Sequence, residues 1–412
     1  MFSIRTIVSS RLSACLSACL SACLSACSSA CSSARSSAGM LGGAALAAAL
    51  LAPASASLAA ESEALASGAV TLPAASPAAL ASAAAGNEGP AYGPELEGFE
   101  YPYPVHRYAF TSQREPLQMA YLDVKPEHAN GRTVVLLHGK NFCAATWEGS
   151  IEVLSRAGYR VIAPDQIGFC KSTKPERYQY SFQQLAHNTH ALLESLGVKE
   201  ATVIGHSTGG MLAVRYALMY PKATQQLVLV DPIGLEDWKA LGVPPLTVDY
   251  WYARELKTTA DSIRRYEQST YYAGEWSPNY ERWVQMLAGM YRGPGRDIVA
   301  WNSALLYDMI LSQPVVYEFG LIRVPTLLMI GDKDTTAIGK DVAPPEVHAR
   351  LGRYPELGKR AHAAIPGSTL IEFPALGHAP QMQDPAAFHK ALLGWLAAPH
   401  AAAASAGGQA AK

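Results

Sequence analysis

The chain has 412 residues with a formal net charge of −1, and hydrophobic residues make up 49% of it. Because no basic excess marks the chain, nucleic acid is not an expected partner. Roughly 300 residues between positions 96 and 398 have the composition of a folded domain, which is enough for one large domain or for a domain with an insertion.

The first 60 residues differ in composition from the rest of the chain. They contain no Asp or Glu, and they hold five of the seven cysteines within a repeated Leu-Ser-Ala-Cys pattern. An apolar run at 40–52 follows Arg35 and precedes Ala-Ser-Ala at 54–56, which is the order of regions in a secretory signal, and the run is too short to span a bilayer. We therefore predict a leader over 1–60 and an exported protein, either periplasmic or secreted.

Two alternatives to a cleaved signal stay open. The Leu-Ser-Ala-Cys repeat resembles a bacterial lipoprotein box, although Arg11 interrupts the apolar stretch that such a box needs. An acid-free leader with serine and arginine is also typical of a transit peptide. Membrane contact is expected only through the leader or a lipid anchor. We predict a low-complexity linker over 61–95 and a disordered, Ala-rich tail over 399–412.

Residues 96–398 carry alternating strand and helix patterns. Strands are predicted where residues alternate or form apolar runs, at 105–111, 119–124, 133–138, 160–164, 201–204, 226–230, 325–330 and 368–373. Helices are predicted between them, at 147–157 with Thr146 as N-cap, at 181–196 with Ser181 and Gln184 as a capping box, at 209–220, and after Asp384. This alternation predicts an α/β fold with a mostly parallel sheet and helices on both faces.

The alternation stops between positions 234 and 318. This segment reads as several helices and holds five of the seven tryptophans. We predict a helical cap of about 234–318, with most of its aromatic side chains in its own core. Four tryptophans are expected to line a substrate pocket shared with the cap, namely Trp251, Trp276, Trp283 and Trp301.

One serine stands between glycines directly after a predicted strand, in Gly-His-Ser-Thr-Gly at 205–209. A strand-to-helix turn of this kind holds a nucleophile on a strained bend that points out of the sheet edge. The glycines leave room on that bend. The pattern alone also fits an ordinary turn, so Ser207 needs a base and an acid to be a candidate nucleophile.

Both partners follow later strands. His378 lies in a Gly-His turn after the last predicted strand, and Asp332 and Asp334 follow the strand at 325–330. In chain order Ser207 precedes Asp334, and His378 comes last, as in the Ser-Asp-His order of the α/β-hydrolase fold. His378 would take the proton of Ser207, and the carboxylate would fix its imidazole. Asp231, after the preceding strand, is the alternative acid.

Five stretches occur in one order along the chain, LLHGKNF, VIAPDQIGFCKS, VIGHSTGGM, GDKDTT and GHAPQMQDP. Together they resemble the α/β-hydrolase superfamily of the capped type, over about 105–396. The resemblance implies an eight-stranded sheet with a helical cap, and it implies that the second Asp of the G-D-x-D loop, Asp334, is the acid. Members of this kind include esterases, haloperoxidases and hydrolases of carbon–carbon bonds.

The resemblance also implies an oxyanion hole. One backbone N–H would come from Thr208, after the nucleophile, and the other from Lys140 in the His-Gly-x loop. The side-chain amide of Asn141 is a further candidate donor. The side chain of Lys140 is expected to face solvent.

Two departures from the family pattern bear on function. Epoxide hydrolases and haloalkane dehalogenases of this superfamily use Asp as nucleophile, so Ser207 disfavours both activities. Cys170 stands where the family usually has Gly, and Cys143 lies in a neighbouring loop. Two separate small hydrophobic side chains are the favoured interpretation, and a disulfide in an oxidising compartment is the alternative.

The sequence therefore predicts a serine hydrolase that cleaves an ester, lactone or related carbonyl substrate with an apolar or aromatic acyl group. Cleavage of a carbon–carbon bond in a diketone is the alternative on the same residues, and a ligand-binding member without turnover is another. No cofactor or metal is expected. His187 and His190, three apart on a predicted helix, are interpreted as solvent-facing. The oligomeric state is left open.

Overall fold

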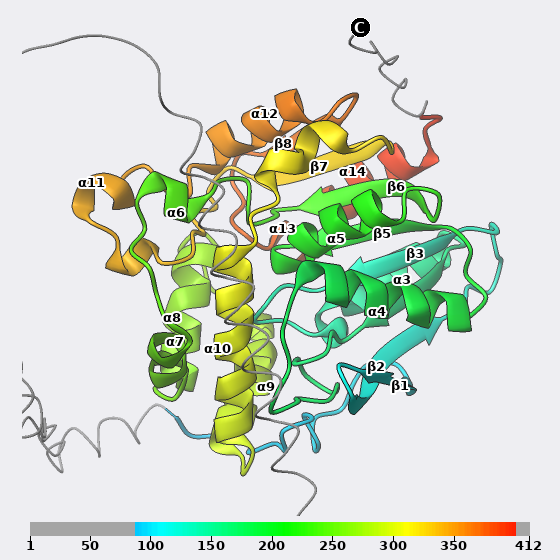
Figure 1. Ribbon diagram of the computed structural model, residues 1–412. Coiled ribbons are helices and arrows are strands. Elements are labelled where there is room, and N and C mark those ends of the chain that lie inside the picture. Colours follow the sequence, from blue (N-terminus) through cyan, green and yellow to red (C-terminus); the bar gives the residue numbers. More distant parts are fainter. Residues whose placement is uncertain (1–86, 401–412) are drawn as a thin grey trace, which may run out of the picture. The chain divides into compact units, whose positions relative to one another are not determined.

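A computed structural model describes residues 87–400 (Figure 1). The predicted leader, residues 61–86 of the predicted linker, and residues 401–412 of the predicted tail lie outside the described residues. Within 87–400, no helix combines the length and apolar character needed to cross a membrane.

One sheet of eight strands organises the domain, in the spatial order β1-β2-β4-β3-β5-β6-β7-β8. The strands are β1 (Val105–Ser112), β2 (Glu115–Val124), β3 (Thr133–Leu137), β4 (Arg160–Pro164), β5 (Ala201–His206), β6 (Thr224–Val230), β7 (Thr326–Gly331) and β8 (Thr369–Phe373). β2 pairs antiparallel with β1 and β4, and the other pairs are parallel. The predicted α/β class and its mostly parallel sheet are confirmed.

Helices cover both faces of this sheet, and each face has its own apolar core. Along β3, Val135 and Leu137 belong to one core, while Val134 and Leu136 belong to the other, because successive side chains of a strand point to opposite faces. The first core is covered by α4 (Phe182–Ser195), α5 (Thr208–Met219) and α12 (Tyr354–Ala364). The second is covered by α3 (Glu148–Arg156) and α14 (Pro385–Ala397).

The predicted helix starts were correct in part. Asp384 caps α14 by accepting a hydrogen bond from the backbone of Ala387. Ser181 accepts from the backbone of Gln184, but the Gln184 side chain donates to Asn188, so only half of the predicted capping box forms. Thr146 was wrongly predicted as an N-cap, because a 3₁₀ turn, η1 (Ala144–Trp147), precedes α3.

A helical segment follows β6 and lies at the carboxyl ends of the parallel strands (Figure 1). It contains α6 (Trp238–Leu241), α7 (Val248–Glu255), α8 (Ala260–Tyr266), the π-helical turn η2 (Glu267–Tyr271), η3 (Pro278–Tyr280), α9 (Glu281–Arg292), α10 (Arg296–Ser312) and η4 (Val316–Leu321). We call α6 to α10 the cap. After β7, η5 (Lys340–Val342), α11 (Pro345–His348) and α12 lead to β8, and α13 (Pro380–Gln383) follows it.

The start of the described chain lies against the cap. The backbone N–H of Tyr92 donates to the Gly289 carbonyl at 2.9 Å, and Arg292 donates to the Pro90 carbonyl at 2.8 Å. A Cβ atom added at Gly289 would lie 2.2 Å from the Tyr92 ring, so α9 can approach this segment only through a glycine. Residues 87–95, which the sequence analysis placed in the linker, are therefore packed on α9.

Candidate active site

Ser207 occupies the turn between β5 and α5. Its backbone lies at φ 57° and ψ −121°, a conformation that is strained for a residue with a side chain. A Cβ atom added at Gly205 would lie 2.1 Å from the Gly209 carbonyl oxygen, so a larger residue would break the turn. Ser207 is 3% exposed. The sequence Gly-x-Ser-x-Gly thus produces a tight, strained turn with a serine at its tip.

His378 and Asp334 form a hydrogen-bonded pair beside this turn. Nδ1 of His378 and Oδ2 of Asp334 are 2.6 Å apart, and both side chains are fully buried. The other oxygen of Asp334 accepts the backbone N–H of Thr336 at 2.8 Å. Because Nδ1 is engaged with Asp334, Nε2 is the nitrogen of His378 that is left for another partner.

The link between His378 and the serine turn runs through His206. Its Nε2–H donates to the His378 carbonyl at 2.7 Å, so the residue next to Ser207 holds the His378 backbone. Within residues 87–400, Nε2 of His378 is buried without a hydrogen-bond partner, and it does not bond to the Ser207 hydroxyl. Such contacts are often loose in unliganded sites and tighten when substrate binds.

Asp231 is the second buried acid at this edge. Its Oδ1 accepts the Gly331 N–H at 2.7 Å, and its backbone φ of 37° is strained. Burial, and then the neighbouring charge of Asp334, raises the pKa of Asp231 well above the usual range of an aspartate. The structure therefore pairs Asp334 with the histidine, and Asp231 links the end of β6 to the end of β7 through its hydrogen bond from Gly331.

The predicted oxyanion loop lies directly against Ser207. A Cβ atom added at Gly139 would stand 2.9 Å from Cβ of Ser207, so the backbone that leads into Lys140 passes beside the serine. Thr208 is the first residue of α5, where backbone N–H groups have no intrahelical partner. The amide of Asn141 donates to the Tyr271 hydroxyl at 3.1 Å, so this candidate donor is already engaged.

Two further histidines support the site without titrating near neutral pH. His138 donates from Nδ1 to the Gly139 carbonyl and accepts the Gln166 N–H at Nε2. Burial lowers the pKa of His138, and burial followed by the proximity of His378 lowers that of His206 well below the ordinary value. Both imidazoles are therefore neutral, and their hydrogen bonds hold the loops around Ser207 in place.

A cavity of about 620 Å³ adjoins this arrangement between the cap and the loop after β7. Its lining includes Thr270, whose carbonyl accepts the His378 N–H, and Thr336, whose N–H donates to Asp334. Ser207, His378 and Asp334 are not themselves among the lining residues. Trp251 and Tyr307 form an aromatic wall of the cavity, because their rings stack with their centres 4.3 Å apart.

The other predicted pocket tryptophans lie elsewhere. Trp276 packs on Tyr272 and Tyr280, and Trp283 packs against Phe99. Trp301 donates to the Glu176 carbonyl at 3.0 Å. Of the four tryptophans, only Trp251 lines the cavity. The cavity is also lined by charged side chains from distant segments, namely Arg254, Lys257, Lys340 and Asp341. The sequence showed no such cluster, because the fold assembles it from the end of α7, the turn that follows it and η5.

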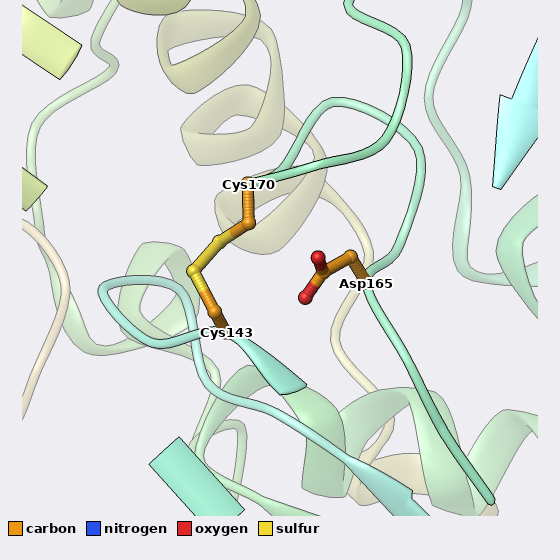
Figure 2. Close-up of side chains that lie close together, drawn as sticks. All are labelled: Cys143, Asp165 and Cys170. Atoms are coloured by element: carbon orange, nitrogen blue, oxygen red, sulfur yellow. A yellow bond between two sulfur atoms is a disulfide. The ribbon is translucent and has the colours of Figure 1, made fainter. Parts of the chain in front are cut away.

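A disulfide joins Cys143 and Cys170, with Cα atoms 5.9 Å apart (Figure 2). The favoured sequence interpretation, two separate side chains, is therefore wrong. Cys170 has a φ of 43°, a conformation that favours the glycine usual at this position in the family. The cysteine accepts that strain and ties the oxyanion loop to the loop after β4.

Asp165 lies beside this disulfide (Figure 2). Its carboxylate accepts hydrogen bonds from the backbone of Ala144, the hydroxyl of Tyr101 and the backbone of Lys171, at 2.7, 2.7 and 3.1 Å. The three side chains of this group are close enough to hold a metal ion, but the disulfide leaves no thiolate for one. The carboxylate instead fixes both loops.

Glu267 and Tyr271 are site neighbours that the sequence analysis missed. The carbonyls of Thr270 and Tyr271 accept the backbone N–H groups of His378 and Ala379, so the π-helical turn η2 holds the histidine loop. Neither carboxyl oxygen of Glu267 has a partner within residues 87–400, and burial raises its pKa to about 8. A π-helical turn leaves no pattern in a single sequence, so only the fold reveals this contact.

Glu267 makes stability depend on pH. Between its ordinary pKa and a pKa of about 8, the folded protein keeps a proton that the unfolded chain has released. The contribution of Glu267 to the free energy of unfolding is fully present below its ordinary pKa. It is lost at ~1.4 kcal/mol per pH unit as the pH rises to the pKa of the folded state. The free energy of unfolding of Glu267→Gln should therefore equal that of the parent near pH 5 and should be larger than that of the parent at pH 8.

Denaturant unfolding of both proteins from pH 5 to 9 measures this difference. Glu275→Gln, on the exposed part of the same segment, controls for the loss of one acidic group. A difference between Glu267→Gln and parent that stays constant with pH would show that Glu267 is not protonated in the folded state.

The comparisons with known proteins agree with this fold. Residues 132–385 match the family model described as alpha/beta hydrolase fold, and the chain belongs to this family of hydrolases. A crystal structure of a probable hydrolytic enzyme from Pseudomonas aeruginosa PAO1 is 68% identical, covers 75% of this chain and 99% of its own, and superposes with a TM-score of 0.75.

Two more distant relatives extend the comparison. An uncharacterized protein of Mycobacterium tuberculosis is 28% identical over 281 residues, which are 63% of this chain and 73% of the relative. The 2-hydroxy-6-oxononadienedioate/2-hydroxy-6-oxononatrienedioate hydrolase of Comamonas testosteroni is 26% identical over 283 residues, which are 65% of this chain and 88% of the relative.

Proposed function

We propose that this α/β hydrolase cleaves esters, lactones or related carbonyl compounds through a covalent acyl-enzyme on Ser207. The observation that carries the proposal is the buried His378–Asp334 pair at 2.6 Å, held by His206 next to a serine on a strained turn. This combination of nucleophile, base and orienting acid is the arrangement that activates a serine hydroxyl.

In the proposed reaction, Oγ of Ser207 attacks the carbonyl carbon while Nε2 of His378 takes its proton. The N–H groups of Lys140 and Thr208 stabilise the oxyanion of the tetrahedral intermediate. The intermediate collapses, and His378 gives the proton to the leaving group. Water then attacks the acyl-enzyme while His378 takes its proton. The second tetrahedral intermediate collapses by breaking the bond to Oγ of Ser207, His378 returns the proton to that oxygen, and the acid product leaves. Asp334 stabilises the imidazolium in both halves.

The aromatic part of the cavity supports a substrate with an apolar or aromatic acyl group, while the charged part, with Arg254, Lys257, Lys340 and Asp341, leaves room for a polar group elsewhere on the same substrate. The stacked rings of Trp251 and Tyr307 provide a flat apolar wall of this cavity. An apolar pocket separates substrates by only ~1–3 kcal/mol per methylene, so the preference should change gradually with acyl length.

Cleavage of a carbon–carbon bond in a diketone is the second candidate function. It is supported by the similarity to the hydrolase of Comamonas testosteroni, which covers 88% of that protein. The same serine, histidine and acid would serve this reaction.

Pre-steady-state kinetics test the proposal. With a series of p-nitrophenyl esters from acetate to benzoate, the enzyme should release a burst of p-nitrophenol equal to the active-site concentration before the slower steady state. A diketone series run in parallel decides between the two candidate reactions. A protein that binds these compounds without a burst and without turnover would be a ligand-binding member of the fold.

We also propose that the protein works outside the cytoplasm. The disulfide between Cys143 and Cys170 supports this, because such bonds persist in oxidising compartments, and the leader composition points the same way. The native product should lack the leader, and its intact mass should rise by two hydrogen atoms on reduction. A cytosolic product that includes residues 1–40 would contradict the proposal.

A further inference from the structure

The side chain of Lys140 is buried, not solvent-facing as the sequence suggested. It is 10% exposed. Its Nζ donates to Oγ of Ser303 at 2.7 Å, lies 3.8 Å from Oε2 of Glu255, and stands 3.7 Å from the centre of the Tyr307 ring. Burial lowers the pKa of Lys140 and the negative charge of Glu255 opposes that shift. The ammonium is thus held by three groups of different chemistry.

All three groups belong to the cap. Glu255 ends α7, while Ser303 and Tyr307 lie on α10. Oε2 of Glu255 also accepts the hydroxyl of Ser303 at 2.5 Å and the hydroxyl of Tyr291 on α9. The cap therefore presents a preformed acceptor, built by three of its helices, and the residue that occupies it comes from the oxyanion loop.

The backbone of Lys140, unlike the groups that hold its side chain, belongs to the loop after β3 and not to the cap. Lys140 follows Gly139, whose backbone passes Ser207 closely, and within residues 87–400 its N–H makes no hydrogen bond. Lys140 does not line the cavity of about 620 Å³. Its side chain is thus placed to hold the loop and not to contact a ligand in that cavity.

We propose that Lys140 is a positioning residue that couples the cap to the oxyanion hole. When the cap packs on the core, Glu255, Ser303 and Tyr307 bind the Lys140 ammonium. These contacts fix the loop so that the Lys140 N–H lies where the oxyanion forms. Displacement of the cap releases the loop. This inference rests on the proposed hydrolase function for its catalytic consequence, but the structural coupling can be measured without turnover.

The first measurement is hydrogen–deuterium exchange of the full-length protein. In Lys140→Met, the peptide that covers Phe142 and Ala144 should exchange at least ~10-fold faster than in the parent, because the loop has lost its ionic contact with the cap and keeps the disulfide and the hydrogen bonds of Asn141 and Ala144. Glu255→Gln should accelerate the same peptide. Unchanged exchange in both variants overturns the proposal whatever the activity.

The second measurement separates positioning from substrate binding. In Lys140→Met, kcat should fall ~10- to 100-fold with KM within about threefold, less than the ~10²- to 10³-fold loss when an oxyanion donor is removed outright. The inhibition constant of a trifluoromethyl ketone should rise by the same factor as kcat/KM falls. Lys140→Arg, which keeps the cation, should recover most of the loss.

Arg282→Gln is the matched control. Arg282 on α9 forms an exposed cap–core ion pair with Glu148 on α3 at 2.9 Å and is not one of the groups that hold Lys140, so its loss should leave kcat unchanged within about twofold. A rise in KM with unchanged kcat in Lys140→Met would make Lys140 a binding residue and overturn the proposal. If exchange accelerates but the parent shows neither turnover nor ketone binding, the coupling stands and the proposed function fails.

Discussion

Ser207→Ala should lower kcat by ~10⁴-fold or more while the protein stays folded, the scale seen when a nucleophile of this kind is removed. The reason is local. Ser207 lies on a strained turn, one residue from the histidine that holds the His378 backbone. Alanine keeps the turn but removes the attacking oxygen. Steady-state kinetics on the best p-nitrophenyl ester, with circular dichroism to confirm folding, measure the effect.

The chain offers a matched control in a second serine–histidine pair. Oγ of Ser150 lies 2.9 Å from Nε2 of His389, and both are buried. Ser150 is on the regular helix α3 and has no strained turn, so it should not act as a nucleophile. Ser150→Ala should keep turnover within about threefold of the parent, as is usual for a substitution away from the reacting groups. Equal losses in both variants would indicate a loss of fold.

Asp334→Asn should lower kcat by ~10³- to 10⁴-fold and leave the fold intact. The carboxylate of Asp334 accepts from Nδ1 of His378 at 2.6 Å, which keeps Nε2 free as the base. An amide at this position offers the histidine a donor, favours the wrong tautomer, and cannot stabilise an imidazolium. The kcat/KM values of the different esters should all fall by the same factor, so that the preference among esters stays as in the parent.

Asp231→Asn tests the competing assignment of the acid. Burial raises the pKa of Asp231 and so favours its neutral form, and asparagine preserves the shape of that form and its hydrogen bond from Gly331. Its kcat should stay within ~10-fold of the parent. If Asp231→Asn is the more damaging substitution, the acid that orients His378 follows β6, and the assignment to Asp334 is wrong.

Local sequence patterns were enough to predict the sheet. All eight strands were predicted within a few residues of their observed bounds, because each combines apolar alternation or an apolar run with flanking turn residues. The serine turn and the histidine loop were also visible, since both follow strands that end at one edge. Those features depend on residues within a few positions of each other.

Long-range contacts explain what the sequence missed. The Lys140 side chain meets Ser303, which is 163 residues away, and no local pattern distinguishes this lysine from one that faces solvent. The disulfide depends on two loops that β3 and β4 bring together. The dense tryptophans of the cap did mark a helical segment, but which of them faces the cavity depends on how its helices pack.

Peptide mapping of the trapped intermediate shows which residue of the protein forms the covalent bond. The parent protein is incubated with a fluorophosphonate or a slowly deacylating ester, digested and analysed by mass spectrometry. The account predicts one covalent adduct, on the peptide that carries Ser207, and none on that peptide in Ser207→Ala. An adduct on any other residue, or turnover of the ester with no covalent adduct at all, would contradict a mechanism through an acyl-enzyme on Ser207.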